Sequence, residues 1–310
     1  MRRSTAIRAA ASTVLAAGLA APLLRRRLKL KPQVVIAAAA ATPFAVTAVV
    51  PRSRKRDVAV CALQMWAYLA TYQMPNDDPE ALRRRVRVEY PVRFDRFIGA
   101  GTTPTMRLQR AFGTPGRFAR WEKLLVWSHW LWFAFPHGTV AYVLLRRREG
   151  FGRAAAQVYA TFDLGVIGYW AIPTAPPWYA AEQGLMEDGR TPELRRMMVE
   201  YGEQFWKSGW APLYGFLGGN PLAAMPSLHF ATSVTAAHVL SDTGRVAGVL
   251  GWSYAATLGL ALVYLGEHYV MDLAAGLALA ETVRRGTPVT APFARRLSRA
   301  VQAIEAQAHV

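Results

Sequence analysis

The residues best suited to chemistry lie in two short stretches, Pro226-Ser227-Leu228-His229 and His268-Tyr269-Val270-Met271-Asp272. Two imidazoles and a carboxylate supply what phosphoryl transfer through a histidine needs: a nucleophile, a group that orients it, and a proton donor. His268 and Asp272 are four residues apart, so they share one face of a helix. A carboxylate that holds one imidazole nitrogen fixes the tautomer and leaves the other nitrogen free to attack phosphorus.

The first stretch is predicted to begin a helix. Ser227 follows a proline and precedes an apolar run, which is typical of an N-cap, and His229 falls in the first turn. Phe230 stands where a capping box would place Glu or Gln, so no side chain takes up the free amides. A helix N-terminus with free N–H groups attracts phosphate. We therefore expect Ser227 to adjoin a phosphate site and His229 to protonate a leaving oxygen.

The composition indicates the environment in which these residues work. Of the 310 residues, 53% are hydrophobic, only 18% are charged and ten are tryptophan, which is unusual for a protein in water. The apolar residues gather in blocks of about 16 to 24, long enough to cross a hydrocarbon core of about 30 Å. Since backbone groups within lipid must be satisfied inside each helix, we predict an all-α, polytopic membrane protein.

The net charge of +17 is concentrated near the N-terminus. Residues 1–56 carry twelve Lys or Arg and no acid, so the rest of the chain contributes only +5. A basic arm beside hydrophobic segments is typical of contact with a cytoplasmic membrane surface, so we expect no nucleic-acid partner. The single cysteine, Cys61, excludes an intrachain disulfide and a cysteine metal cluster.

Two apolar segments in the region 1–56 admit more than one interpretation. The apolar run of residues 5–24 is typical both of a signal peptide and of a first membrane helix. Residues 33–50 have basic clusters at both ends, so both flanks look cytoplasmic, which one straight crossing cannot satisfy. A hairpin broken near Pro43 and a weakly determined crossing both remain open.

From residue 57 the pattern predicts a more regular domain, 57–285, followed by a cytoplasmic tail, 286–310. Its six crossings are 57–74, 122–145, 154–173, 227–241, 246–265 and 268–284, with external loops at 79–120 and 174–226. Both ends of this domain are then cytoplasmic. Counting crossings brings Trp178, His229 and His268 to the same outer face, although they are distant in sequence.

Three stretches resemble the motifs of the type 2 phosphatidic acid phosphatase superfamily. They are Ala224 to His229, His268 to Asp272, and the corner Pro173-Thr174-Ala175-Pro176-Pro177-Trp178. The likeness covers residues 57–285 in layout and is greatest to the branch with fungal inositol phosphorylceramide synthase and bacterial relatives. It implies a six-helix core, preceded here by additional hydrophobic segments, with an outward-facing site. It also implies a nucleophilic His268, oriented by Asp272, and an acid/base His229.

The chain departs from the broader superfamily pattern at two positions near these histidines. Leu228 stands where most members have glycine, as it does in the synthase branch, and Leu262 stands where an arginine is usual. The Lys and Arg-Pro of the first motif are likewise replaced by the proline corner. The phosphate charge must then be met by other groups, with Lys207, Arg190 and the arginines of 83–96 as candidates.

These observations predict an integral membrane phosphotransferase that moves a phospho-headgroup, such as inositol phosphate, between lipids. The donor would be a phospholipid or lipid phosphate and the acceptor a lipid or polyol, without metal or cofactor. We expect a multi-pass protein of the plasma membrane with its site on the extracytoplasmic face. Further residues expected to bind substrate are Pro176, Pro177, Trp178, Lys207 and Tyr269, together with Ser227.

Two other functions remain open. With the same residues, the protein would be a phosphatase of lipid phosphates or polyprenyl phosphates. A non-catalytic lipid transporter or scaffold that kept the fold is the alternative from another class. Of the other histidines, His129 and His238 are predicted to pack, and the aromatic cluster Trp127 to Phe135 is predicted to form an interfacial, lipid-facing belt.

Overall fold

The computed structural model describes residues 2–114, 116–186, 194–217 and 219–310, and within these ranges its regular structure is helical. The extended pairing described there consists of isolated bridges of Thr174 with Arg87 and with Ala223. The predicted all-α class is therefore confirmed. The chain divides into two compact units, Met1–Asp77 with Val283–Val310, and Asp78–Thr282.

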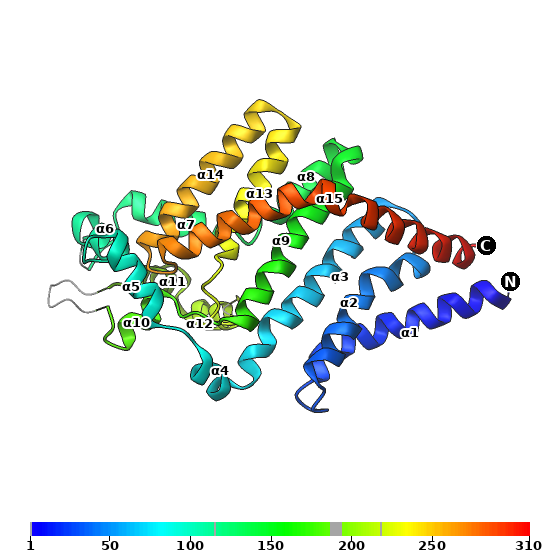
Figure 1. Cartoon of the computed structure of the whole chain (residues 1–310), viewed down its shortest axis with the longest axis horizontal. Helices are drawn as coiled ribbons and strands as arrows, with labels where there is room; N and C mark the ends of the chain where they lie inside the picture. The colour runs from blue at the N-terminus through cyan, green and yellow to red at the C-terminus, as the bar shows by residue number, and fades with distance from the viewer. Residues whose placement is uncertain (1, 115, 187–193, 218) are drawn as a thin grey trace. The chain divides into compact units, whose positions relative to one another are not determined.

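The first unit contains three successive helices and the end of a fourth. Helix α1 (Arg2–Leu24) packs on α2 (Pro32–Val49), and α2 packs on α3 (Arg54–Gln73). The α1–α2 pair is drawn in blue in Figure 1. The last part of α15 (Val270–Ala308) also belongs to this unit, and that helix continues past Pro288 and Pro292.

Pro43 does not break α2, so residues 33–50 form one helix rather than a hairpin. A proline lacks the N–H that would bond the carbonyl four residues earlier, here that of Ala39. The Thr42 hydroxyl donates to this carbonyl over 2.7 Å instead. Because the orphaned group is satisfied locally, the helix tolerates the proline even where water is scarce.

The two basic flanks of α2 lie at opposite ends of one helix, so they cannot both be cytoplasmic if α2 crosses the membrane. Arg25 and Arg26, before α2, both pair with Asp77 at distances of 2.6 and 2.7 Å. Beyond its other end, Arg52 and Arg56 pair with Glu305. Charge at each end is thus partly neutralised by a carboxylate, which weakens the topological signal read from the basic residues alone.

The second unit holds the remaining predicted crossings. Helix α13 (Leu228–Thr243) packs on α14 (Arg245–Tyr264), forming the yellow pair in Figure 1. Helices α8 (Phe135–Arg146) and α9 (Phe151–Ala171) contact α13, while α7 (Arg120–Leu131) contacts α14. The region 79–120 folds into α4 (Pro79–Arg85), α5 (Glu89–Ile98) and α6 (Pro104–Phe112). The region 174–226 contains α10 (Pro177–Glu182), α11 (Met197–Trp206) and α12 (Trp210–Leu217).

The segment 122–145, predicted as one crossing, is two helices separated by a turn at 132–134. Pro136 lies in the first turn of α8, where its missing N–H costs nothing, whereas inside a continuous helix it would have left a carbonyl unpaired. The turn directs Trp132 inward, where its Nε1 donates to Thr232 Oγ1 over 2.8 Å.

The aromatic cluster is therefore not a simple lipid-facing belt. Trp127 and Phe133 are exposed, as predicted. Trp130 instead packs among rings of the second unit, those of Tyr201, Phe205, Trp206 and Trp210.

Three helices in the described part of the chain are long and apolar enough to cross a membrane. They are Arg3–Leu24, Pro32–Val49 and Arg245–Tyr264. Helix α13 has only 16 residues, and α7 and α8 have 12 each, which is less than the roughly 20 residues of a straight crossing.

Candidate active site

Backbone hydrogen bonds join the three predicted motifs. Ser227 N donates to Asp272 O over 3.0 Å, which ties the start of α13 to the start of α15. The proline corner is tied to both stretches, because Ala224 N donates to Thr174 O and Trp178 N donates to Gly266 O. The motifs that the sequence separates by up to ninety residues thus form one assembly.

Ser227 caps α13 as predicted. Its hydroxyl accepts from Phe230 N over 3.3 Å, and the helix begins at Leu228, so His229 is the second helical residue. Serine is favoured here because its short side chain reaches back to an amide that no helical carbonyl can bond. The cap fixes the direction in which His229 leaves the helix.

His229, His268 and Asp272 form a linked series of side chains. Asp272 Oδ2 lies 3.3 Å from His268 Nδ1 and accepts from Tyr269 N over 2.9 Å. His268 Nε2 faces His229 Nδ1 at 3.2 Å. Asp272 is fully buried and His268 is only 4% exposed. The nitrogen that Asp272 leaves free is therefore Nε2, and a second imidazole stands directly in front of it.

The start of α15 is held by a carboxylate that the sequence analysis missed. Asp95 of α5 is fully buried, and its oxygens lie 3.0 Å from Val270 N and 3.4 Å from Met271 N. It therefore caps the helix that carries Asp272, although it is 175 residues away. Burial raises the pKa of Asp95 to about 6, and the two amide hydrogen bonds oppose part of that rise.

Glycines on neighbouring helices enclose the stretch from Pro226 to Phe230. A Cβ at Gly168 of α9 would lie 2.7 Å from Pro226 Cδ, and one at Gly276 of α15 would lie 2.7 Å from Ser227 O. A Cβ at Gly165 would overlap the Leu228 side chain. The missing side chains let the helices approach closely, so the histidine is positioned by packing as well as by its cap.

The other predicted substrate-binding residues are only partly assembled around this site. Pro176 and Pro177 begin α10, and Trp178 is buried beneath the Arg196 guanidinium, 3.9 Å from the ring centroid. Tyr269 is fully buried in an apolar cluster with Val92, Met106, Ala180 and Met186. Lys207 is exposed at the end of α11. Arg190 lies outside the described residues.

His129, predicted to pack, stands against the histidine pair. Its ring centroid lies 4.7 Å from that of His229, whose other neighbour, Trp132, is 4.0 Å away. His129 is buried, and neither of its ring nitrogens has a hydrogen-bond partner in the described part of the chain. No local sequence signal marks it, because its contact with His229 joins two segments about a hundred residues apart in the chain.

His238 behaves as expected. It pairs with Glu281 of α15 over 2.9 Å, away from the other three histidines, and so links two helices. Among the described residues, no group of His, Cys, Asp and Glu is arranged to hold a metal ion.

A cationic cavity, here called the arginine cavity, borders the motif at Met225. Its volume is about 1050 Å³, and it is lined by side chains of α4, α5 and α10 and of the segments beside them: Arg83, Arg87, Glu89, Tyr90, Arg93, Tyr179 and Gln183 among others. The Tyr90 hydroxyl lies 3.0 Å from Thr174 Oγ1 and 3.6 Å from Met225 Sδ. Burial raises the pKa of Tyr90, so its hydroxyl stays a hydrogen-bonding group at neutral pH.

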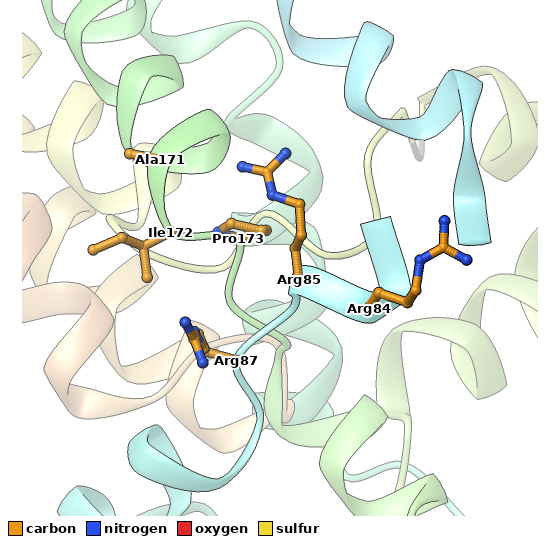
Figure 2. Close-up of a pocket in the computed structure, with 6 residues that line it drawn as sticks. All are labelled: Arg84, Arg85, Arg87, Ala171, Ile172 and Pro173. Atoms are coloured by element: carbon orange, nitrogen blue, oxygen red, sulfur yellow. The ribbon is translucent and has the colours of Figure 1, made fainter. Parts of the chain in front are cut away.

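A second, smaller cavity has a volume of about 290 Å³. It shares two lining residues, Arg87 and Ile172, with the arginine cavity. Figure 2 shows Arg85 and Arg87 beside Ile172 and Pro173, with Arg84 extending away from them. Arg85 donates to the Trp170 carbonyl at the end of α9. Arginines of the region 79–120, which counting crossings assigns to the outer side, thus surround the proline corner.

Comparison with known proteins agrees with the resemblance drawn from the motifs. The model of the PAP2 superfamily matches residues 120–283, more than half of the chain. A phosphoinositol dihydroceramide synthase of Bacteroides thetaiotaomicron is 32% identical over 121 residues. This match covers 38% of the chain and 39% of that relative, so the chain spans well under two thirds of the relative's length. No solved structure matches the chain.

Proposed function

Because the chain belongs to the PAP2 superfamily of lipid phosphatases and phosphotransferases, we propose that it transfers a phospho-headgroup between lipids through a phosphohistidine. The observation that carries the proposal is the series Asp272–His268–His229, in which Asp272 and His268 are buried, one nitrogen of His268 is held and the other faces a proton carrier. The same geometry suits any phosphoryl transfer with a histidine nucleophile.

In the first step His268 Nε2 attacks phosphorus, and the bond from phosphorus to the lipid oxygen breaks. His229 gives its proton to that oxygen, so a neutral alcohol leaves. The carboxylate of Asp272 keeps the proton of His268 on Nδ1 and stabilises the charge that develops on the ring. Since Nε2 and His229 Nδ1 are only 3.2 Å apart, the phosphoryl group must enter by separating the two rings.

In the second step the hydroxyl of the acceptor attacks the phosphohistidine. His229, now neutral, takes the proton of that hydroxyl as the P–N bond breaks, which regenerates both histidines. The start of α13, where Ser227 takes up the Phe230 amide, and nearby basic side chains are assigned the charge stabilisation. Two successive displacements at phosphorus predict overall retention of its configuration.

Two features favour transfer over hydrolysis. Leu228 follows the synthase pattern, and Leu262, at the position of the usual arginine, is completely buried, so its side chain offers the substrate no charge. The matched relative is named as a synthase of a phosphoinositol lipid. We therefore propose that the donor is an anionic phospholipid with a polyol headgroup and that the acceptor is a lipid alcohol of the ceramide type.

The arginine cavity is proposed to receive the anionic headgroup. Three arginines line it against one carboxylate, Glu89, which already pairs with Arg93 over 2.6 Å. Arginine binds phosphate oxygens through paired N–H groups, and tyrosine and glutamine side chains suit the hydroxyls of a polyol. Lys207 remains a further candidate for the same charge.

We also propose that residues 57–285 form the catalytic membrane domain, with six crossings and both ends cytoplasmic. The basic stop Arg146-Arg147-Arg148 supports this direction, which would put the site on the extracytoplasmic face of the plasma membrane.

The decisive experiment uses purified protein with headgroup-labelled phosphatidylinositol, with and without ceramide. Transfer predicts labelled sphingolipid that requires the acceptor. Label released as free inositol phosphate without an acceptor would instead establish a hydrolase. A protein for which both wild type and His268→Ala leave every tested phospholipid unchanged would be a non-catalytic member of the family.

A further inference from the structure

The buried ring of His129 is in an unusual state for a protein interior. Both of its nitrogens lack hydrogen-bond partners in the described residues, although buried polar groups are almost always paired. The ring is 6% exposed and lies against His229. His229 in turn contacts the nucleophile, His268. An unpaired polar group at this place is explained if its partner is the substrate.

The charge state of His129 follows from its neighbours. His229 and His268 lie within the same group of rings, and His229 must become an imidazolium during each transfer. The Trp132 ring, 4.0 Å from His229 between ring centroids, also stabilises that cation. A second buried cation beside it would be strongly unfavourable, so His129 acts as a neutral imidazole, with one N–H donor and one acceptor nitrogen.

The site has an uncharged side chain, Leu262, at the position where the family resemblance leads us to expect an arginine. Helix α7, which carries His129, packs on α14, which carries the buried Leu262 where an arginine is usual. The phosphoryl group held between His268 and His229 then meets a neutral N–H instead of a guanidinium. Such a donor suits a phosphodiester, with one negative charge shared by two non-bridging oxygens, better than the dianion of a phosphomonoester.

We propose that His129 is a third catalytic histidine, whose N–H binds a non-bridging oxygen of the reacting phosphodiester. The proposal rests on the proposed function for its nucleophile. It makes the site selective for lipid phosphodiesters over lipid phosphomonoesters.

The main test compares headgroup transfer by the wild type, His129→Phe and His129→Ala. Phenylalanine keeps a ring against His229 but has no donor, so we expect kcat to fall about 100-fold, as for the loss of one donor to a transition-state oxygen, with little change in KM. Imidazole added to His129→Ala should restore part of kcat in a saturable way, and it should not help His129→Phe, whose ring fills the space. His137→Phe, in which a histidine stacked on Phe162 is replaced, is the matched control and should keep wild-type kcat.

The outcomes separate this proposal from the function on which it rests. If His268→Ala is inactive while His129→Phe keeps more than a third of wild-type kcat, the role of His129 is overturned and the transferase stands. Absence of rescue by imidazole in a His129→Ala protein that unfolds at the wild-type temperature would also overturn it. So would wild-type turnover of phosphatidic acid as fast as that of phosphatidylinositol.

Discussion

The histidine site and the arginine cavity meet at Met225 but are built in opposite ways. In the histidine site, His129, His268 and Asp272 are buried and His229 is half-buried, and backbone hydrogen bonds between distant segments hold the helix starts in place. The arginine cavity is open, and Arg83, Arg87 and Arg93 that line it are exposed.

This difference separates two tasks. Nucleophilic attack requires a fixed geometry, because small displacements of a reacting atom are costly in rate. Recognition of an anionic headgroup requires charge that acts at a distance and side chains that adapt. Substitutions in the histidine site should therefore change kcat, and substitutions in the arginine cavity should change KM.

The largest effect is expected for the nucleophile and its carboxylate. His268→Ala should lower kcat by at least about 10⁴-fold, and Asp272→Asn by about 10³- to 10⁴-fold through the wrong tautomer, with KM nearly unchanged. Steady-state kinetics in detergent micelles measures both. His238→Gln is the control, because His238 contacts Glu281 away from the site and should keep wild-type kcat. An active His268→Ala protein would remove the phosphohistidine from the mechanism.

A smaller loss is expected for the proton carrier. His229→Ala should lower kcat by about 10²- to 10⁴-fold with a lipid alcohol as leaving group. With a nitrophenyl ester, whose leaving group needs little protonation, the first step should survive and the second should stall. The variant should then accumulate an acid-labile phosphoryl group at His268, which peptide mapping can locate. Label on any other residue would contradict the assignment of roles.

The third effect concerns Asp95, which caps the helix that carries Asp272. The pKa of Asp95, about 6, exceeds its value of about 4 in an unfolded chain, so between these values the folded state binds the proton more tightly. The resulting stabilisation is complete below about pH 4 and is lost as the pH rises through about 6, roughly 2–3 kcal/mol in all. Unfolding followed by tryptophan fluorescence should show this slope in the wild type and lose it in Asp95→Asn. Equal slopes would mean that Asp95 does not titrate in this range.

The smallest effect is expected in the arginine cavity. Because Arg87 is exposed, its replacement in Arg87→Gln should raise KM for the anionic donor only about fivefold, with kcat unchanged, and salt should reduce the difference. Arg84→Gln is the matched control, since Arg84 lies next to the cavity residues but does not line the larger cavity. A fall in kcat rather than a rise in KM for Arg87→Gln would erase the proposed division between the two regions.

Local patterns in the sequence predicted the parts of the site that depend on local structure. Ser227 caps its helix with its own hydroxyl, as its position predicted. Asp272 contacts His268 four residues away as expected, but His268 precedes α15, which begins at Val270, so the pair spans the start of the helix and does not share a helix face. The position of α14 also follows from its apolar run. The family resemblance, which rested on these short motifs, is confirmed by the match over residues 120–283.

The parts that sequence reasoning missed depend on contacts between distant segments. Asp95 caps a helix 175 residues away, and nothing near it in the sequence indicates a buried carboxylate. His129 contacts His229 about a hundred residues away, and hydropathy shows the segment around His129 only as part of one continuous crossing. In both cases tertiary packing assigns the residue its partners, and no local propensity reports them.

The contact between Leu228 and Gly165 bears on how such enzymes change over evolution. The leucine fills space that Gly165 leaves empty, so the two positions share one volume. A relative with glycine at the equivalent of 228 has room for a larger residue at the equivalent of 165, and the two should be inherited as a pair. Replacing Leu228 by glycine alone would leave a void beside Gly165. Introducing leucine at the equivalent of 228 in a relative with a larger residue at the equivalent of 165 would cause a clash. Conversion of one branch into another therefore has to cross a poorly packed intermediate unless both helices change together.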